Sequence, residues 1–499
     1  MSGDGDFGLL SPVSASPAVV ALTGDRAVIA AILDVEAAWA SVLEEAGFAP
    51  AGSAAVVAEA TESWAYDAAS IAERAQGGAN PVIPLLADLR SRVRQLDAGH
   101  PGGAIGALSA VHTSLTSQDV LDSALMLLAH RVVSVLLAEV KGTTTALAAL
   151  AEQHADTLCV GRSLAQHALP FTFGLKAAQW FHGVAAAARR LEALELPVQF
   201  GGAGGTLAAG TVLTEGSPLT EGSSLTEGSS LTEGSSSSPF ALADALAEKL
   251  GLAPVPAPWH TNRLAVTGLG DALAALTDSF GKIASDLLFL SRPEVAELGE
   301  PLAAGRGVSS AMPQKQNPVL SVLIRSAALQ APGLAMQLHL AAANFNDERP
   351  DGAWHSEWQA LRQLLRLGLG AATQLRELAE GLRVFPEAMR RNLEISGPLL
   401  LSEAVASSVA PLLGADRSDA KARLQAVVDE TLRAPAAEQA RIYTKLLREA
   451  VPASKLSDED LQALLDPANY VGEAAEISRR ILAAYPEFSH TNPKGADLG

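Results

Sequence analysis

The sequence predicts an all-α protein built around a long central helical bundle. Hydrophobic residues make up 48% of the 499 positions and aromatic residues only 4%, and alanine and leucine dominate. Such a composition favours helices that pack closely through small side chains. Apolar residues also recur at three- and four-residue spacings over several long stretches, which is the periodicity of a helix with one buried face.

The first predicted helix runs from Asp25 to Glu45, where the apolar residues fall largely on one face. A longer helix is predicted between Leu125 and Leu150, a stretch without proline. Helices of about 25 to 30 residues span ~40 Å and pack side by side into a bundle. Because such rods leave apolar faces that neighbouring subunits can cover, we expect a homo-oligomer. Comparable stretches cover residues 172–196, 264–290, 317–343 and 355–383.

A chain of this length suits several domains better than one. We predict an N-terminal helical domain over residues 1–117, a central bundle over 118–383, and a C-terminal helical domain over 384–499 whose last residues, from about 485, form a frayed tail. Within the central domain, residues 213–236 repeat a six-residue unit of the type LTEGSS four times. A short repeat rich in glycine and serine cannot bury a core, so we predict a flexible surface insertion at about 211–238.

The net charge limits the kinds of partner that we expect the chain to bind. With 36 Lys and Arg against 55 Asp and Glu, the chain carries −19, which argues against nucleic acid or an anionic membrane as a partner. The single cysteine, Cys159, excludes an intramolecular disulfide and a multi-cysteine metal cluster, and suits a reducing cytoplasm. The N-terminus lacks the features of a secretory signal, and no uncharged apolar stretch approaches the ~20 residues of a membrane span. We therefore expect a soluble, cytoplasmic protein.

Residues 307–318, read as GVSSAMPQKQNP, form the segment with the most chemistry. Gly305 and Gly307 permit the backbone conformations of a mobile loop, whereas Pro313 and Pro318 forbid a helix between them. We name this segment the flap.

The flap combines hydroxyl, ammonium and amide groups. Ser309 and Ser310 offer hydroxyls that can carry a proton, Lys315 a cation, and Asn317 an amide able to stabilise an anion. The alternative is an ordinary surface loop with incidental serines.

Polar side chains also precede two long helices. In VHTSLTSQD, residues 111–119, the hydroxyls either cap the following helix or bind an anion at its N-terminus, and we favour carboxylate binding. GRSLAQHALPFTFGLKAA, residues 161–178, is predicted to be a loop that runs into a helix. The candidate binding residues of the two segments are His112, Thr116, Ser117, Gln118, Arg162, Gln166 and His167.

Arginines supply the forked donors that bind carboxylates in bidentate fashion. Arg162, Arg263 in PWHTNRLA and Arg349 are the candidates, and the alternative for each is an ordinary ion pair with one of the many acidic residues. The glycines of QFGGAGGTLA, residues 199–208, lack the spacing and the strand context of a dinucleotide site.

The flap resembles the G-S-S-x-M-P-x-K-x-N-P signature of the fumarase/aspartase superfamily, with Val308 in place of the usual glycine. This resemblance implies a three-domain, all-α subunit, a homotetramer with active sites shared between subunits, and no metal or organic cofactor. It also implies that Ser309 is the catalytic acid/base. Lys315 and Asn317 would then bind a substrate carboxylate or stabilise the loop. We expect Lys315 to take part in catalysis with Ser309, and Ser310 to bind substrate.

Several segments, TSQDVLDSALML, QFGGAGGTLA and PWHTNR, are similar to the carboxymuconate cycloisomerase branch of the superfamily. That similarity implies a small tricarboxylate substrate. In the second region, Leu164 stands where adenylosuccinate lyase relatives have a histidine that acts as general acid. The alternatives are another superfamily lyase, of the adenylosuccinate or argininosuccinate type, or a structural relative without activity.

Overall fold

The computed structural model describes residues 8–215, 238–413 and 416–489. The chain divides into two compact units, and each is described by itself. Unit one comprises Met1–Ala138, Ala188–Asp278 and Ser326–Thr373, and unit two comprises Glu139–Ala187, Ser279–Arg325 and Gln374–Gly499. The predicted all-α class is confirmed, while the predicted division into three domains stays a prediction.

The long helices follow the predicted periodicity. They are α2 (Asp25–Glu45), α6 (Ser117–Gln153), α7 (Phe173–Glu192), α10 (Leu264–Leu290), α11 (Val319–Ala342) and α12 (Gly352–Glu380). The shorter helices are α1 (Pro17–Thr23), α3 (Ser53–Ala60), α4 (Ala68–Ala75), α5 (Val82–Ala98), α8 (Ala208–Glu215), α9 (Pro239–Leu250), α13 (Pro386–Ser396), α14 (Ser402–Val409), α15 (Arg417–Arg433), α16 (Ala436–Ala450), α17 (Asp458–Leu464), α18 (Ala474–Ala484) and α19 (Pro486–Ser489).

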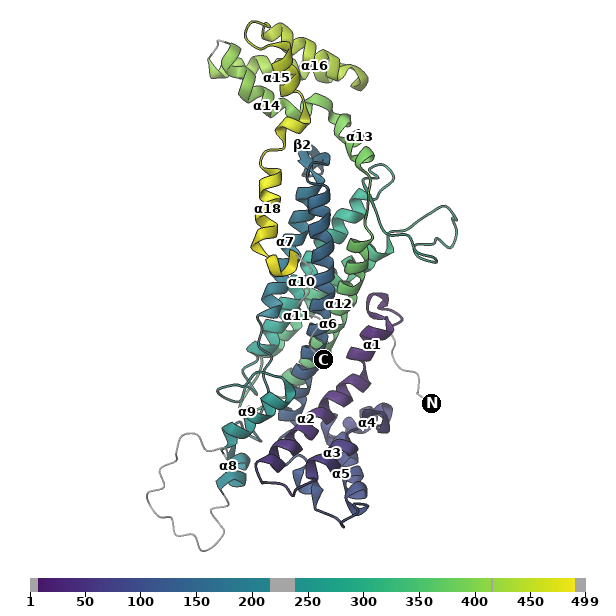
Figure 1. Ribbon diagram of the computed structural model, residues 1–499, viewed down its shortest axis with the longest axis vertical. Helices are drawn as coiled ribbons and strands as arrows, with labels where there is room; N and C mark the ends of the chain where they lie inside the picture. Colours follow the sequence, from purple (N-terminus) through teal and green to yellow (C-terminus); the bar gives the residue numbers. More distant parts are fainter. Residues whose placement is uncertain (1–7, 216–237, 414–415, 490–499) are drawn as a thin grey trace, which may run out of the picture. The chain divides into compact units, whose positions relative to one another are not determined.

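In unit one, α2, α3 and α5 lie side by side (Figure 1). Trp39 of α2 is fully buried, and its indole N–H donates to the carbonyl oxygen of Thr113 at 2.7 Å. This bond fixes the segment that leads into α6, which carries the first group of predicted site residues.

Small residues let the long helices of unit one approach closely. A side-chain carbon added at Gly270 of α10 would lie 2.6 Å from Leu338 of α11, and one added at Gly368 of α12 would lie 3.3 Å from Leu136 of α6. The glycines are therefore contact points between helices, as the small-residue composition predicts.

Three helical segments within the described residues are long and apolar enough, by length and composition, to cross a membrane: Ser117–Gln153, Val319–Ala342 and Pro386–Leu413. This corrects the expectation that no such stretch occurs. In the first segment 72% of the apolar window is buried inside the protein, because a bundle helix with an alanine- and leucine-rich surface packs on several sides.

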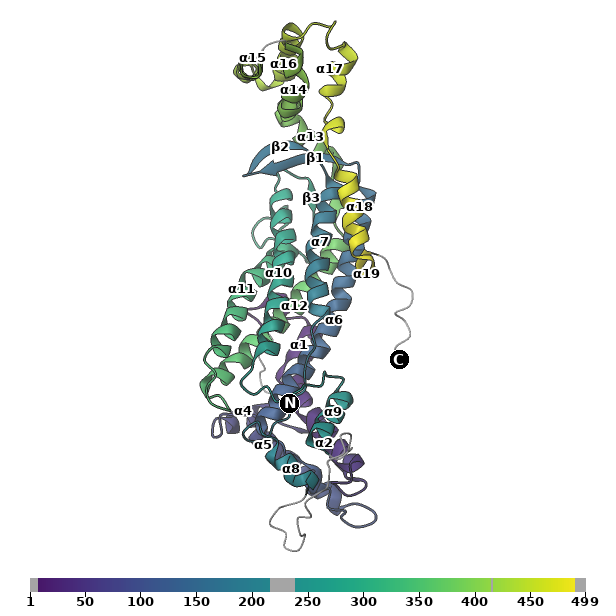
Figure 2. The ribbon, with the colours of Figure 1, turned by 90° about the vertical axis from the view of Figure 1, so that its left-hand side faces the viewer.

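Unit two contains a β-hairpin that the sequence reading missed, since residues 161–178 were expected to begin as a loop. Strand β1 (Leu158–Ser163) pairs antiparallel with β2 (Gln166–Thr172), and β1 contacts α13 (Figure 2). A second short antiparallel pair joins β3 (Leu298–Gly299) to β4 (Arg383–Val384).

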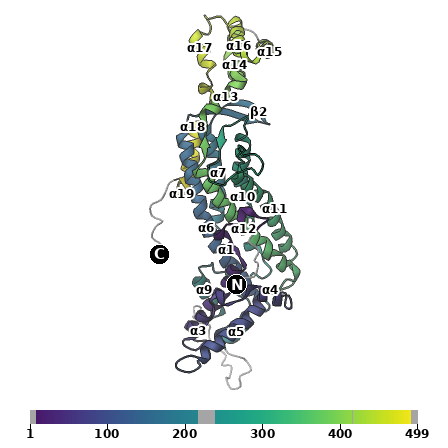
Figure 3. The ribbon, with the colours of Figure 1, turned by 90° about the vertical axis from the view of Figure 1, so that its right-hand side faces the viewer.

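Helices α14 to α17 of unit two enclose a separate apolar core (Figure 3). Its most buried side chains include Val405, Val409, Tyr443 and Leu447. The structure differs from two predictions of flexible segments. The insertion was expected to begin at about residue 211, but α8 continues to Glu215, and the tail was expected to begin at about 485, but Pro486–Ser489 are helical. The remainder of the predicted insertion and of the predicted tail, residues 216–237 and 490–499, lies outside the described residues.

Candidate active site

The N-terminus of α6 carries the first group of predicted residues. Asp119, the third residue of the helix, accepts the backbone N–H of Thr116 through Oδ2 at 2.9 Å, the reach-back contact of a capped helix. Thr116 Oγ1 instead accepts from Arg349 Nη1 at 2.8 Å. A carboxylate therefore provides this cap, and the Thr116 hydroxyl faces the arginine.

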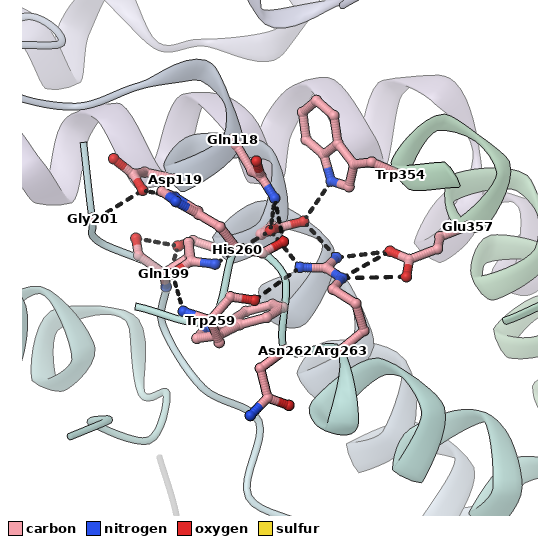
Figure 4. A network of polar contacts seen from close by, with 12 residues as sticks. Gln118, Asp119, Gln199, Gly201, Trp259, His260, Asn262, Arg263, Trp354 and Glu357 are labelled. Atoms are coloured by element: carbon pink, nitrogen blue, oxygen red, sulfur yellow. Dashed lines mark hydrogen bonds and ion pairs between the residues drawn. The ribbon is translucent and has the colours of Figure 1, made fainter. Parts of the chain in front are cut away.

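Asp119 also ties two distant segments to the helix (Figure 4). Its carboxylate accepts the backbone N–H groups of Gly201 at 2.9 Å and Gly202 at 3.0 Å. His260 Nε2 lies 2.8 Å from Asp119 Oδ1, and both side chains are buried. The glycine-rich segment 199–208 thus binds a protein carboxylate through its amides.

One turn further along α6, Asp122 pairs with Arg263. Arg263 Nη1 and Nη2 donate to the two Asp122 oxygens at 2.8 and 2.9 Å, and Nη2 and Nε donate to Glu357 at 2.8 to 3.2 Å. Nη1 also reaches the carbonyl oxygen of Trp259 at 3.5 Å. Arg263 is only 3% exposed, and its guanidinium donates to acceptors of the protein. This matches the alternative stated for the arginines, an ion pair with acidic residues of the chain.

Asp122 also accepts hydrogen bonds from two other side chains. Trp354 Nε1 donates to Asp122 Oδ1 at 2.9 Å, and Gln118 Nε2 donates to Asp122 Oδ2 at 3.2 Å and to the carbonyl oxygen of His260 at 2.9 Å. These bonds orient the Gln118 amide so that its oxygen faces Arg349 Nε at 3.4 Å.

Two carboxylates share the single positive charge of Arg263, and the protonation of Glu357 reflects this. Burial raises the pKa of Glu357 to about 7, and Asp122 adds to the rise, although Arg263 opposes it. Burial therefore keeps Glu357 protonated to a higher pH than an exposed carboxyl group, and Arg263 offsets this only in part.

Arg349 differs from Arg263 because fewer of its donors are bonded within the protein. It is partly exposed, and its bonds to Thr116 and Gln118 use Nη1 and Nε. Among the described residues Nη2 has no acceptor, so this side of the fork can bind an external carboxylate. Ser117, the first residue of α6, is half-buried and lies between Thr116 and Gln118 in the sequence.

His112 lies on the same approach to α6. Its Nδ1 is 2.7 Å from Glu36 Oε1 of α2, and the residue has a left-handed backbone with φ of 61°. A non-glycine residue in this conformation is held by its surroundings, here by the hydrogen bond to Glu36 and by the neighbouring bond from Trp39 to Thr113.

The second group of predicted residues lies in unit two, on the β1–β2 hairpin. Arg162 forms a fork-to-fork pair with Glu297, with distances of 2.5 and 3.2 Å. The turn consists of Leu164 and Ala165, which have φ of 50° and 64°. Leu164 is 96% exposed at the tip of the hairpin, and Gln166 beside the turn is also exposed.

His167 is partly enclosed at the base of that turn. Its Nδ1 lies 3.0 Å from Ser396 Oγ. Burial, followed by the charge of Arg162, lowers the pKa of His167. The imidazole is therefore neutral near pH 7 and suited to hydrogen bonding.

The flap is a small closed loop in unit two. Val308 and Gln316 form an isolated β-bridge, and Asn317 donates its backbone N–H at 2.8 Å and its Nδ2 at 3.2 Å to the carbonyl oxygen of Gly307. Ser309 Oγ accepts the backbone N–H groups of Met312 at 3.1 Å and Ala311 at 3.4 Å. Donors aimed at a hydroxyl oxygen favour its deprotonated form.

The other polar residues of the flap face solvent. Ser310 and Lys315 are exposed, whereas Ser309 and Asn317 are half-buried. The structure therefore brings Thr116, Gln118 and Arg349 together in unit one. The hairpin and flap residues belong to unit two.

The sequence reading left out the carboxylates that organise unit one. Asp119 and Asp122 are three residues apart on α6, and this spacing, which puts both on one helical face, could have indicated them. Glu357 gave no local signal, because its partner Arg263 lies 94 residues away in the sequence.

Replacement of Glu357 by glutamine is expected to change how stability depends on pH. The unfolded carboxyl has its ordinary pKa of 4.5, whereas the pKa of the folded one is about 7. The native protein therefore binds more protons in this window, and its free energy of unfolding falls as pH rises from about 4.5 to 7. The loss is up to about 3 kcal/mol, and Glu357→Gln should remove it.

Urea unfolding of both proteins between pH 4.5 and 8 measures this effect. Glu380→Gln, at an exposed position of the same helix, is the control and should keep the wild-type slope. Equal slopes in wild type and Glu357→Gln would contradict the assignment.

Comparisons with known proteins agree with the fold and the motifs. A family model described as lyase matches residues 15–221 and 222–333. The chain is 40% identical over 478 residues to a nitrosuccinate lyase of Streptomyces davaonensis, covering 95% of this chain and 94% of that protein. It is 35% identical over 477 residues to a 3-carboxy-cis,cis-muconate cycloisomerase of Bradyrhizobium diazoefficiens, covering 95% and 97%.

A solved structure extends this likeness to three dimensions. The crystal structure of the 3-carboxy-cis,cis-muconate lactonizing enzyme from Pseudomonas putida superposes with a TM-score of 0.81 at 32% identity, covering 97% of this chain and 100% of that one. With the family model matching more than half of its length, the chain belongs to the lyase family of the fumarase/aspartase superfamily.

Proposed function

We propose that this protein is a cycloisomerase that converts 3-carboxy-cis,cis-muconate to 4-carboxymuconolactone, a step in the breakdown of protocatechuate. The observation that carries the proposal is the apolar tip of the hairpin. Leu164 is 96% exposed at the position where superfamily relatives that expel amines have an acid. Cycloisomerase relatives and the likeness to the lactonizing enzyme support the same reaction.

The absence of a proton donor at residue 164 is chemically informative. A lyase that expels an amine must protonate a poor leaving group, whereas a carboxylate is stable as an anion and needs no acid. Leu164 therefore suits a reaction in which the attacking or departing group is an anion. Cyclisation of a muconate by its own carboxylate is such a reaction.

The proposed reaction needs one proton transfer. A carboxylate oxygen of the substrate forms a C–O bond to a carbon of the conjugated diene, and the π-electron pair moves onto the neighbouring carbon and its carboxylate as an enediolate. Ser309 then donates its hydroxyl proton to that carbon. The serine recovers a proton from water, so the trianionic substrate becomes a dianionic lactone with net uptake of one proton.

The flap geometry supports this role for Ser309. Two backbone N–H groups, of Ala311 and Met312, donate to its Oγ and would stabilise the alkoxide left after proton transfer. Lys315 and Asn317 lie on the same loop, and we assign them to the negative charge of the enediolate. Ser310 would add a hydroxyl donor.

We assign the binding of a substrate carboxylate to the N-terminus of α6. Arg349 presents the open side of its fork next to Thr116, Ser117 and Gln118. The positive end of a 37-residue helix adds to the attraction for an anion. We assign His112 to this site and Arg263 to its support, and we propose that Arg162, Gln166 and His167 of unit two also bind substrate.

A second candidate is elimination of nitrite from nitrosuccinate to give fumarate. The 40% identity to a nitrosuccinate lyase favours it. Nitrite also departs as a stable anion, so Leu164 is compatible with this reaction as well. Both candidates need one residue that handles a carbon-bound proton, and Ser309 fills that role in each.

A homotetramer in the cytoplasm is the proposed setting. The side chains of Leu329, Met336 and Leu340 on α11 are 73%, 60% and 52% exposed and lie seven and four residues apart, which places them on one face of the helix. Such a stripe suits burial against further copies of the chain.

Light scattering should give about four times the 51.4 kDa chain mass, and a value at one chain mass would contradict the assembly.

Loss of the Ser309 hydroxyl should remove turnover. Ser309→Ala is expected to lower kcat by about 10² to 10⁴-fold, the usual contribution of a positioned acid or base. The assay is the loss of the conjugated-diene absorbance of 3-carboxymuconate. Gln314→Ala, at an exposed flap position without an assigned role, is the matched control and should keep most of the activity.

Two outcomes would redirect the proposal. Nitrite release from nitrosuccinate, without any change in 3-carboxymuconate, would replace the cycloisomerase by the second candidate. Wild-type activity of Ser309→Ala on the true substrate would refute the assigned mechanism for both.

A further inference from the structure

The flap is part of a longer loop that runs from Glu300, directly after β3, to the start of α11. Glu300 is only 8% exposed, and its carboxylate bonds to the far end of this loop. Oε2 accepts the backbone N–H of Leu320 at 3.1 Å, and Oε1 accepts the backbone N–H and the hydroxyl of Ser321, both at 2.7 Å. One buried carboxylate therefore ties the two ends of the loop together.

Glu300 also caps the first turn of α11. The helix begins at Val319, so Leu320 and Ser321 are its second and third residues, whose backbone N–H groups have no partner within the helix. Pro318, the residue before the helix, has no side-chain acceptor, and Glu300 takes the place of a capping side chain. A negative charge is favourable at this end of a helix. The base of the flap is thus fixed on the first turn of α11.

A second tie closes the neck of the flap, where residues 306–308 meet residues 316–317. Gln316 Nε2 donates to the carbonyl oxygen of Arg306 at 2.8 Å. The backbone of Gln316 also pairs with Val308 in the isolated β-bridge. The side chain of one residue therefore bonds the two sides of the neck, in addition to the backbone.

Gly307 shows how closely the two sides of the neck approach. Its carbonyl oxygen accepts the backbone N–H of Asn317 at 2.8 Å and the Asn317 Nδ2 at 3.2 Å. A side-chain carbon added at Gly307, which has φ of 69°, would lie 2.5 Å from Gln316 Nε2 and 2.5 Å from the Asn317 carbonyl oxygen. Only glycine fits at this point, and the neck is tightly closed.

The neck carries the catalytic part of the flap. An ion pair between Arg306 and Glu377 of α12 anchors the neck to a helix. Beyond the neck, Ser309 Oγ accepts the backbone N–H of Met312 at 3.1 Å, and Lys315 donates its backbone N–H to the Met312 carbonyl oxygen at 3.1 Å. Ser309 and Lys315 are joined through Met312, so the neck sets their place in unit two.

We propose that Glu300 and Gln316 are positioning residues of the active site, which act on the substrate through Ser309 by holding the flap. This inference rests on the role proposed for Ser309 in catalysis. Gln316 stands at a position that the superfamily signature leaves open, and its bridge partner Val308 replaces the usual glycine. The tie across the neck is therefore a feature of this chain and not of the shared signature.

Loss of either tie should lower the rate more than the affinity. A displacement of about 1 Å of a catalytic group can cost about 10²-fold in rate. Binding of a substrate carboxylate is assigned to Arg349 and Thr116, which take part in neither tie. A residue with a purely structural role would change the fraction of folded protein and leave kcat per folded molecule unchanged.

A matched pair of variants tests the neck. Gln316→Met keeps the length of the side chain and removes the amide donor, and Gln314→Met makes the same change at an exposed flap position without an assigned role. In Gln316→Met, kcat should fall about 2- to 10-fold, the value of one hydrogen bond, with KM within about twofold of wild type. Gln314→Met should keep both constants.

Glu300→Gln tests the base of the flap. The variant keeps the shape of the side chain and loses its charge, so kcat should fall about 10- to 10²-fold, in line with the greater strength of bonds to a charged group. Glu294→Gln, at an exposed position before β3, is the control and should keep the wild-type kcat.

Hydrogen exchange gives a signal that needs no substrate. The backbone N–H groups of residues 307–318 should exchange faster in Gln316→Met and in Glu300→Gln than in the wild type, because the loop opens more often. Helix α10 should exchange at the wild-type rate in both variants.

Three results would overturn the inference: wild-type kcat in both variants, a loss of activity that lies wholly in KM, or wild-type exchange of the flap in both. Should Glu300→Gln fail to fold, Gln316→Met decides alone. The kinetics use whichever of the two candidate substrates the protein turns over. An active Ser309→Ala protein refutes the proposed mechanism, whereas an inactive one beside wild-type kcat in both tie variants refutes this inference alone.

Discussion

The guanidinium of Arg263 is the point on which the arrangement of unit one depends. It lies between Asp122 of α6 and Glu357 of α12, and it also reaches the carbonyl oxygen of Trp259. Removing a buried cation of this kind would leave two carboxylates without compensation, a cost of several kcal/mol. The ion pairs therefore fix the relative positions of segments that are far apart in the sequence, and Asp119 and His260 extend the same clamp to the glycine-rich segment.

This constraint divides the arginines by function. Arg263 is saturated by protein acceptors, so it stabilises the helices and orients Gln118 through Asp122. Arg349 is held by Gln118 and Thr116 but keeps one side of its fork open. A carboxylate site needs such a half-satisfied guanidinium, since a fully paired one has no donor left and a free one has no fixed position. The buried network thus holds Gln118, and through it Arg349, in a fixed position.

Helical periodicity made the long helices predictable, and α2 and α10 begin and end at the expected residues. The β1–β2 hairpin was missed because Leu164 and Ala165 occupy left-handed turn positions that usually carry glycine or asparagine. The motif residues were visible in the sequence, but the side chains that hold them were not. Contacts such as that between Arg263 and Glu357 join residues far apart in the chain, and no local pattern encodes them. An arginine among polar neighbours gives the same sequence pattern whether it binds substrate or supports the fold. Sequence alone therefore could not show that Arg263 and Arg349 have different roles.

A crystal structure of the Ser309→Ala variant with 3-carboxymuconate bound would distinguish the roles of the two arginines. We expect a substrate carboxylate on Arg349 and Thr116, with Arg263 still paired to Asp122 and Glu357. An Arg263 side chain released from Glu357 and bound to the substrate would contradict it.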